Sequence, residues 1–176
     1  MQTLLLWRHA KSDWGDPSLP DHARPLADRG RAAAPAIALE MARRNLLPER
    51  VLCSSAQRTR ETCAALLPHL AFERPVDIVL TERLYHAEAS DLLGVIREQG
   101  GKASPLLIIG HNPTLEDFLA MLGPEFNAAV ARAQMKFPTA ALAVITLPSD
   151  SWATLSFGPP GSCSLESFVT PGDLED

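Results

Sequence analysis

The stretch Thr3-Leu4-Leu5-Leu6-Trp7-Arg8-His9-Ala10-Lys11-Ser12 places two basic side chains directly after an apolar run of strand length. The apolar run is continuous, and residues 13–17 after it are rich in turn formers, so a buried strand is predicted over roughly residues 2–8. In open α/β sheets, ligands bind beyond the carboxyl ends of the strands. We therefore expect Arg8 and His9 to lie at the edge of the sheet where such a protein holds its functional site.

The composition is typical of a globular protein and limits the possible partners. The 176 residues suffice for one domain with a sizeable core, since 46% of them are hydrophobic and 21% are charged. The formal net charge of −5 argues against nucleic acid and anionic membranes as bulk partners. No apolar run is long enough to cross a membrane, and the N-terminus lacks the plan of a secretory signal, so we expect a cytoplasmic location. The oligomeric state stays open.

Apolar runs of strand length alternate with helical patterns along the chain. A long loop over residues 10–27 leads to a helix from Asp28 to about residue 44, although Pro35 argues for a bend or a later start. Further strands are predicted at 50–53, 76–80, 106–109, 141–145 and 152–157, and further helices at about 55–67, 90–99 and 113–122. This alternation predicts an α/β fold, a three-layer αβα sandwich around a mostly parallel sheet, with 152–157 as an antiparallel edge strand.

The C-terminal segment has a different composition from the rest of the chain. Residues 158–176 are rich in Pro, Gly, Ser and acidic residues. Such a segment has little apolar surface to bury, so we expect a loosely packed tail. The predicted organisation is a single catalytic domain over residues 1–157 followed by this tail.

Basic side chains follow three of the predicted strands. Arg8 and His9 come after the first strand, Arg58 lies in the first turns after the second, and His111 follows the fourth. Parallel strands bring their carboxyl ends to one edge of a sheet, so these side chains can converge. Guanidinium groups match phosphate oxygens with forked donors. His111 precedes Asn112-Pro113, which marks a helix N-terminus where an anion is favoured. The pattern predicts a phosphate site.

A histidine in such a site can act as a nucleophile. A neutral imidazole that faces a phosphoryl group can form a covalent phosphoenzyme and so divide one difficult displacement into two. The surrounding cations would stabilise charge on the equatorial oxygens. Taken alone, each residue also fits an ordinary role: His9 as a satisfied histidine, Arg58 as a solvated helix arginine, His111 as part of a helix cap. The joint arrangement is what favours catalysis.

Four segments make the chain resemble the histidine phosphatase superfamily, the phosphoglycerate mutase-like proteins. They cover residues 6–12, 24–30, 54–62 and 109–112. Each pattern is weak alone, but four in this order and spacing are specific, and the similarity spans roughly residues 1–147. Within the superfamily, the chain is similar to the short bacterial branch of SixA-type phosphohistidine phosphatases. The resemblance implies a phosphoglycerate mutase-like fold and a reaction that needs neither metal nor cofactor.

The resemblance also implies roles for the basic residues. His9 would be the phosphorylated nucleophile, and Arg8, Arg58 and His111 would complete the catalytic and substrate-binding pocket. The superfamily motif often reads Arg-His-Gly, and here Ala10 stands in place of the glycine. This replacement adds a methyl group and removes no catalytic group.

The general acid is the role for which the chain offers two candidates. Family members commonly place a carboxylate after the third strand, and Glu82 is the best match, although it also fits a solvated loop glutamate. His86 is the second candidate. A phosphohistidine or a phosphoanhydride is a good leaving group, so such a substrate needs little help from an acid.

The segment between Glu82 and the fourth strand bears on the reaction. One short helix fills most of it, whereas mutases and sugar-phosphate phosphatases of the family generally carry longer insertions that cover the pocket. Without such a cover a phosphoenzyme is open to water, so hydrolysis is favoured. We therefore expect a phosphatase that acts through phospho-His9 on a phosphorylated substrate, first of all a protein phosphohistidine. A small phosphomonoester or diphosphate is the alternative, and a non-catalytic phospho-ligand-binding module is disfavoured by the intact pocket.

Overall fold

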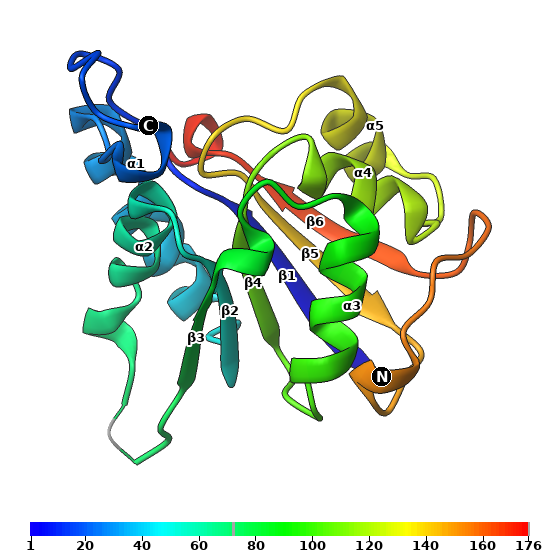
Figure 1. Ribbon diagram of the computed structural model, residues 1–176. Helices are drawn as coiled ribbons and strands as arrows, with labels where there is room; N and C mark the ends of the chain where they lie inside the picture. Colours follow the sequence, from blue (N-terminus) through cyan, green and yellow to red (C-terminus); the bar gives the residue numbers. More distant parts are fainter. Residues whose placement is uncertain (72, 176) are drawn as a thin grey trace.

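The computed structural model describes residues 1–71 and 73–175 (Figure 1). Its elements follow in chain order as β1 (Gln2–Arg8), η1 (Asp21–Ala23), α1 (Asp28–Arg43), β2 (Arg50–Ser54), α2 (Gln57–Ala64), η2 (Leu67–His69), β3 (Asp77–Thr81), η3 (Glu82–Leu84), α3 (Ala89–Gln99), β4 (Leu106–Gly110), α4 (Thr114–Met121), α5 (Ala128–Met135), β5 (Leu142–Leu147), η4 (Trp152–Thr154), β6 (Ser164–Val169) and η5 (Pro171–Leu174), where η denotes a 3₁₀ helix. The predicted strands before residue 148 and the helices α1 to α4 are thus confirmed, with ends that move by at most three residues.

Within the described residues, the strands form one mixed sheet in the order β3-β2-β4-β1-β5-β6. β1 lies in its interior, where Leu4 is opposite Leu106 of the parallel β4 and opposite Ile145 of the antiparallel β5. β2 pairs in parallel with both β4 and β3, and β6 pairs antiparallel with β5. The mostly parallel α/β sheet is therefore confirmed, but its antiparallel strand, β5, lies one place in from the edge.

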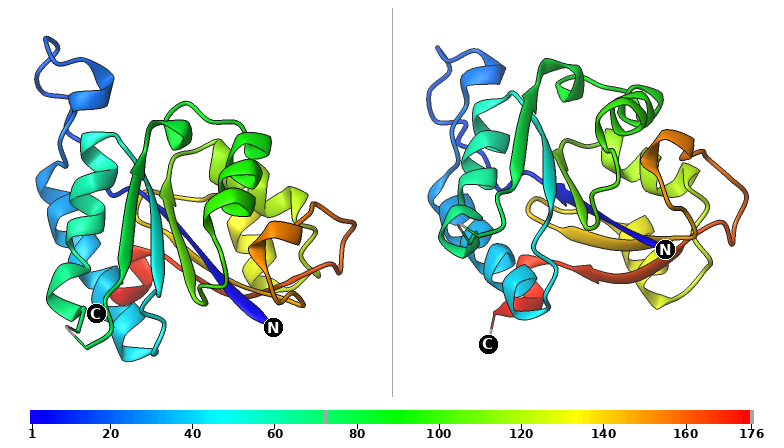
Figure 2. Two further views of the ribbon diagram at one scale, coloured as in Figure 1. Left: turned by 60° about the horizontal axis from the view of Figure 1, so that its bottom comes forward. Right: turned by 90° about the horizontal axis from the view of Figure 1, so that it is seen from below.

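Helices cover both faces of the sheet, as the two views of Figure 2 show. Alternate residues of β1 serve the two faces because successive side chains of a strand point in opposite directions. Leu4 and Leu6 join the core under α3, α4 and α5, whereas Leu5 and Trp7 join the core under α1 and α2. All four side chains are fully buried. The three-layer sandwich holds β1, and with it His9, at the centre of the molecule.

The prediction of an edge strand at 152–157 is wrong. Residues Trp152–Thr154 form a short 3₁₀ helix, because the Trp152 side chain is buried against α3 and its Nε1 donates a hydrogen bond to the Ala103 carbonyl (2.6 Å). The apolar alternation in this segment comes from that packing, and in the sequence it looks like the pattern of a short strand.

The prediction of a loosely packed tail at 158–176 is also wrong. β6 lies inside this segment and pairs with β5 at the edge of the sheet. Leu165 and Phe168 are buried, three residues apart, because the register shifts between Val144 and Ile145 of the partner strand. This bulge breaks the period of two by which a strand is recognised in a sequence.

Two helix starts differ from the prediction. α4 begins at Thr114, and the Asn112 side chain does not cap it; its Nδ2 donates hydrogen bonds to Glu116 Oε1 (2.7 Å) and to the Phe137 carbonyl (2.8 Å). α5 was not expected, although Asn127 marks its start by accepting a hydrogen bond from the Val130 amide (2.9 Å). α1 begins at Asp28 and continues through Pro35.

The start of α1 packs closely on the chain just after His9. A Cβ atom at Gly30 would lie 2.2 Å from the Lys11 carbonyl oxygen, which is closer than any side chain allows. The Ala27 amide donates a hydrogen bond to the same oxygen (2.9 Å). Glycine at this position therefore lets α1 brace the segment that carries His9. No helix of the described ranges is both long and apolar enough to cross a membrane.

Candidate active site

The carboxyl ends of β1 and β4 bring two histidines together. Arg8 is opposite Gly110 in the sheet, and the His9 amide donates a hydrogen bond to the Gly110 carbonyl (3.1 Å). His111 follows β4 directly, so its ring lies beside that of His9, with centroids 5.2 Å apart and planes inclined by 52°. Arg58 reaches the same place from the first turn of α2, and its Nη2 lies 3.4 Å from His111 Nδ1. The predicted convergence of the four residues is thus what the structure contains.

His9 is held with one ring nitrogen available. Its Nδ1 lies 2.7 Å from the Ala10 carbonyl oxygen. A carbonyl can only accept, so Nδ1 carries the hydrogen and Nε2 keeps its lone pair. The side chain is buried, and burial, followed by the charges of Arg58 and Arg8, lowers the pKa of His9 to about 4. His9 is therefore neutral at physiological pH, in the tautomer that a nucleophile requires.

His111 is fixed in the opposite tautomer. Its Nε2 lies 2.8 Å from Ser54 Oγ, and its Nδ1 faces the Arg58 guanidinium, which can only donate. Nδ1 is therefore the acceptor, and Nε2 carries the hydrogen that it donates to Ser54. Burial, with the neighbouring His9 and Arg58, lowers the pKa of His111 to about 3. Ser54 is fully buried at the end of β2, so it sets the orientation of the His111 ring.

The two arginines present their guanidinium groups differently. Arg8 Nη1 donates to the Phe137 carbonyl (2.8 Å), while its buried Nε finds no hydrogen-bond partner among the described residues. Burial lowers the pKa of Arg8, against the influence of Glu116. Arg58 donates through Nη1 to the Asp21 carbonyl (2.9 Å) and through Nη2 to Asp21 Oδ2 (3.1 Å). A buried donor without a partner is costly unless a ligand accepts from it, so Arg8 Nε marks a place for an anion.

Asp21 and Tyr85 belong to the site although the sequence reasoning did not identify them. Tyr85 Oη donates a hydrogen bond of 2.6 Å to Asp21 Oδ2, and the tyrosine ring lies 5.7 Å from the His111 ring, centroid to centroid. Asp21 lies in η1, inside the predicted long loop over residues 10–27. The signal available in the sequence was an acidic residue three positions before Arg24, which on its own points to no partner.

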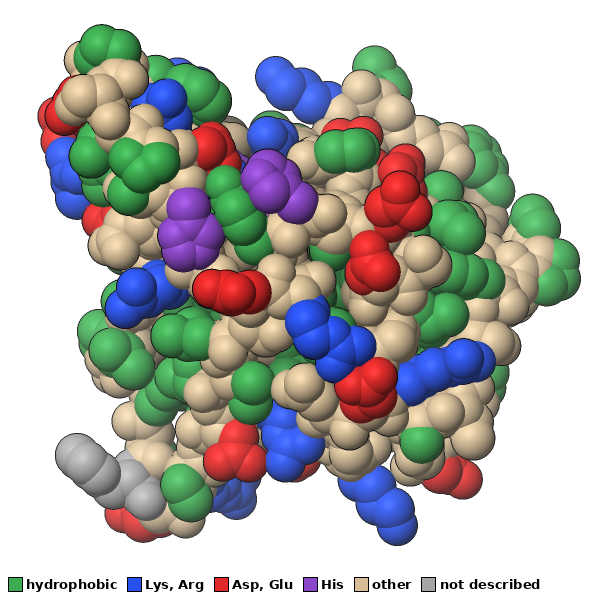
Figure 3. Space-filling view, viewed as in Figure 1, with side chains coloured by type: hydrophobic (Ala, Val, Ile, Leu, Met, Phe, Trp, Pro, Cys, Tyr) green, Lys and Arg blue, Asp and Glu red, His purple; other side chains and the backbone are tan. Residues whose placement is uncertain are grey.

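The structure does not bring the candidate acids into contact with His9. Glu82 is the exposed first residue of η3, and its carboxylate makes no hydrogen bond within the described residues. His86 is also exposed, and its ring packs on Tyr85 with centroids 4.0 Å apart. Figure 3 shows histidine side chains on the surface beside acidic and basic ones, above the carboxyl ends of the parallel strands.

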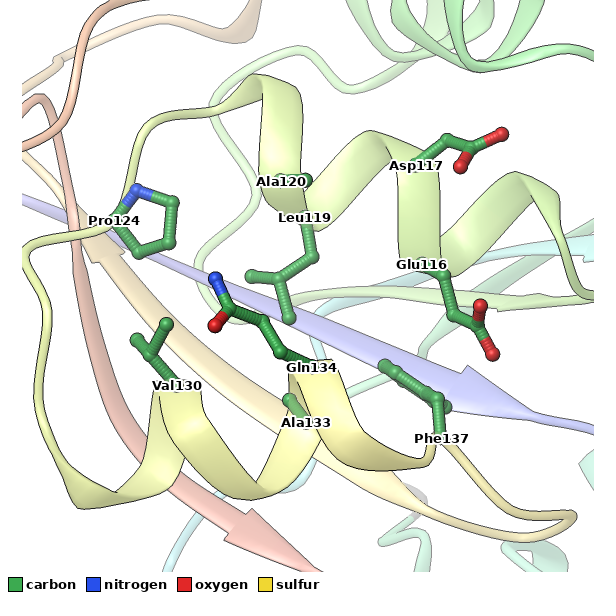
Figure 4. Close-up of a pocket in the computed structure, with 9 residues that line it drawn as sticks. All are labelled: Glu116, Asp117, Leu119, Ala120, Pro124, Val130, Ala133, Gln134 and Phe137. Atoms are coloured by element: carbon green, nitrogen blue, oxygen red, sulfur yellow. The ribbon is translucent and has the colours of Figure 1, made fainter.

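A separate hollow lies between α4 and α5, away from the reactive nitrogen of His9 (Figure 4). Leu119, Val130 and Phe137 line it with apolar surface, and Glu116 stands at its rim. Two of its lining residues also face the site: the Phe137 carbonyl accepts the hydrogen bonds of Arg8 and Asn112, and Glu116 accepts from Asn112.

The site has the chemistry of an oxyanion pocket. It combines a neutral imidazole with a free lone pair, two guanidinium groups and a second neutral imidazole. Guanidinium donors favour a group with several negatively charged oxygens, and the free nitrogen suits attack at the central atom of that group. Among residues 1–71 and 73–175, no three His, Cys, Asp or Glu side chains gather closely enough to hold a metal ion.

Comparison with known proteins shows the family to which the chain that forms this pocket belongs. The model of the histidine phosphatase superfamily (branch 1) matches residues 4–141, a range that contains His9, Arg58 and His111. The chain belongs to this superfamily. The uncharacterized protein ML1117 of Mycobacterium leprae is 39% identical over 170 residues, which cover 93% of this chain and 99% of that protein.

Two solved structures show the same fold over nearly the whole chain. A structure assigned as the phosphohistidine phosphatase SixA of Agrobacterium tumefaciens is 32% identical, with a TM-score of 0.77 and 97% and 98% of the two chains covered. Another with this assignment, from Nakamurella multipartitia, is 26% identical, with a TM-score of 0.78 and 97% and 96% covered. The expected phosphoglycerate mutase-like fold and the similarity to SixA-type members of the superfamily are therefore confirmed.

Proposed function

We propose that this protein is a metal-independent phosphatase that acts through a phosphohistidine intermediate on His9, with a protein phosphohistidine as its substrate. The observation that carries this proposal is the hydrogen bond of 2.7 Å between His9 Nδ1 and the Ala10 carbonyl. It fixes the tautomer whose Nε2 lone pair is free, in a buried ring that is neutral above about pH 4. The pocket around it supplies the cations that a transferring phosphoryl group requires.

The reaction has two displacements. His9 Nε2 attacks the phosphorus, the bond from phosphorus to the leaving group breaks, and the phosphoryl group becomes bound to His9. Arg8 and Arg58 offset the charge on its oxygens, and His111 contributes its ring from the opposite wall. A water molecule then attacks the phosphorus and gives a proton to the group that protonated the leaving group, the P–N bond breaks, and phosphate leaves with His9 neutral again. The short connection from β3 to β4, in which η3 and α3 are the only elements of the described chain, leaves little to cover the site and so supports hydrolysis rather than transfer to a second substrate.

The substrate proposal rests on the neighbours of the chain and on the mouth of the site. The proteins to which it is similar at 32% and 26% identity are assigned as phosphohistidine phosphatases. The exposed His86 and the half-buried Tyr85 leave the entrance accessible to a side chain of another protein. The same entrance also admits a small phosphomonoester or diphosphate, which is the second candidate substrate class.

Glu82 and His86 are both proposed as sources of the proton for the leaving group. An acid matters most when the leaving group is a poor one, such as an alkoxide. Replacement of the true donor, in Glu82→Gln or His86→Gln, should therefore slow hydrolysis of an alkyl phosphate far more than that of p-nitrophenyl phosphate. If neither variant changes the ratio of the two rates, neither residue is the acid.

The function is tested with p-nitrophenyl phosphate in the presence of a metal chelator. The wild type should hydrolyse it, His9→Ala should lose the activity, and a phosphate label should be trapped on the wild type and not on the variant. His69→Ala is the matched control, since His69 lies in η2 and no hydrogen bond or ring contact joins it to the site within the described residues. Turnover at the wild-type rate by His9→Ala would exclude His9 as the nucleophile. A clear preference for sugar phosphates over a phosphohistidine-bearing protein domain would exclude the proposed substrate class and favour the second.

A further inference from the structure

We infer that Asp21 is a positioning residue of this site, which holds the Arg58 guanidinium in the orientation that grips the phosphoryl group. The inference deepens the proposed function and rests on it for the identity of the ligand. Asp21 holds Arg58 at two points: its backbone carbonyl accepts from Nη1 (2.9 Å), and its Oδ2 accepts from Nη2 (3.1 Å). Two contacts of this kind fix the plane of the guanidinium as well as its place.

The hold on Arg58 leaves donors free for a ligand. A guanidinium has five N–H groups. Those that face Asp21 and His111 are engaged, whereas Nε and the second hydrogen of Nη1 have no partner among residues 1–71 and 73–175. The Arg58 side chain is only 11% exposed, so few other orientations are open to it. Asp21 thus selects which N–H groups of Arg58 turn to the phosphoryl oxygens.

Asp21 is itself held by Tyr85. The tyrosine hydroxyl donates to Oδ2 at 2.6 Å, and this hydrogen bond, followed by the charge of Arg58, keeps the pKa of Asp21 below its ordinary value. Burial and the neighbouring carboxylate raise the pKa of Tyr85, so the tyrosine keeps its proton. Arg24 Nε lies 3.9 Å from Oδ1 on the other side. The carboxylate is therefore an ionised acceptor, tied between the loop 10–27, α2 and the segment after η3.

The negative charge of Asp21 allows a test based on whether anion affinity rises or falls when the carboxylate is removed. A carboxylate beside an anion site repels the anion, so its removal tightens anion binding if the carboxylate is only a nearby charge. Its removal weakens anion binding if the carboxylate is what orients Arg58. The two roles predict opposite changes for the same variant. The Asp16 side chain, in the same loop, accepts hydrogen bonds only from Ser18 among the described residues, so Asp16→Asn is a matched control for the loss of one charge.

The experiment measures tungstate binding by calorimetry, together with p-nitrophenyl phosphate turnover. Asp21→Ala should bind tungstate about tenfold more weakly than the wild type, the effect of losing one charge-assisted contact, and should lose kcat/KM to a similar degree. Asp21→Asn keeps an oxygen acceptor and should recover most of this loss. Tyr85→Phe should show a smaller loss, because Arg58 keeps both contacts. Asp16→Asn should match the wild type.

Tungstate binding by Asp21→Ala that is equal to or tighter than that of the wild type would overturn the inference. The Asp21 side chain is 40% exposed, so this variant should fold, and its melting temperature verifies that. The binding measurement does not depend on turnover. A wild type that hydrolyses no phosphate, with weaker tungstate binding in Asp21→Ala, would refute the proposed function and leave the role of Asp21 supported. An active wild type with unweakened binding in Asp21→Ala would refute the role of Asp21 alone.

Discussion

The rings of His9 and His111 lie with centroids 5.2 Å apart, and each holds its single hydrogen on the nitrogen that points away from the shared pocket. His9 donates it to the Ala10 carbonyl and His111 donates it to Ser54 Oγ. Both rings are buried near two guanidinium groups, so a proton on either ring is unfavourable. The pair is consequently neutral, with an unengaged lone pair on His9 Nε2 and an Nδ1 on His111 that accepts from Arg58.

The neutral state of His9 sets the acid side of the pH–rate profile. Its pKa is lowered from 6.5 to about 4, and protonation removes the attacking lone pair. We expect kcat/KM, which reports on the free enzyme, to stay constant as the pH falls from 7 to about 5 and to decline only near 4. Steady-state assays with an aryl phosphate, corrected for the titration of the substrate, measure this. A decline centred at pH 6.5 would contradict the burial argument.

The two histidines should also make the fold sensitive to acid. Their pKa values are about 4 and about 3 in the folded protein, against 6.5 for an unperturbed histidine. Below pH 6.5 the unfolded chain binds protons at both positions and the folded chain does not. The stabilisation is therefore complete above pH 6.5 and is lost as the pH falls toward 4, by on the order of 2 kcal/mol for each histidine at pH 4.5.

This dependence can be measured as the free energy of unfolding in urea at pH 7 and pH 4.5. The difference between the two values should be smaller in His9→Ala than in the wild type, because one of the two sites is gone. His69→Ala, which removes a histidine from η2, should show the wild-type difference. An unchanged difference in His9→Ala would mean that other groups govern the acid sensitivity.

Ser54→Ala should impair the site without touching the substrate. Ser54 is fully buried, and its hydroxyl is the partner of His111 Nε2. Its loss leaves a buried N–H without an acceptor, so we expect about 1–3 kcal/mol of destabilisation and about a tenfold loss of kcat/KM. Because Ser54 acts through His111, the double variant with His111→Ala should lose little more activity than His111→Ala alone. Additive losses would show that Ser54 acts by another route.

Two glycine variants should change stability in opposite directions. Gly30→Ala would place a Cβ 2.2 Å from the Lys11 carbonyl oxygen, so α1 or the segment after His9 must shift, which should cost about 3 kcal/mol and reduce activity. Gly94 lies in α3, and the nearest atom to an added Cβ there is Arg83 Nη2 at 3.9 Å. Gly94→Ala should therefore stabilise by about 0.5–1 kcal/mol. Urea unfolding of both variants measures the contrast, and equal effects would contradict it.

Much of the fold was predictable because local patterns and burial agree. The continuous apolar runs at β1 and β4 are buried on both faces, which is the feature that makes a parallel strand readable. The prediction failed at β6, where the bulge opposite Val144 and Ile145 places Leu165 and Phe168 three residues apart. Such a strand is specified by its partner, and no local pattern contains that information.

The residues of the site likewise include some that the sequence predicts and some that it does not. His9, Arg8, Arg58 and His111 follow strand ends or open a helix, so the topology of a parallel sheet places them together. Asp21 sits in a loop whose path depends on contacts with Arg58 and with residues after β3. Loop conformation is set by tertiary contacts, so its contribution was beyond sequence reasoning.

The interior position of β1 imposes an order on biosynthesis. Leu4 pairs with Leu106 on one side and with Ile145 on the other, so the strand that carries His9 must wait for both partners while the ribosome continues translation. Contacts of such long sequence separation form slowly, and an apolar strand without partners is prone to aggregation in the meantime. The candidate site therefore cannot form on a nascent chain that stops before β5, so it is completed late in synthesis.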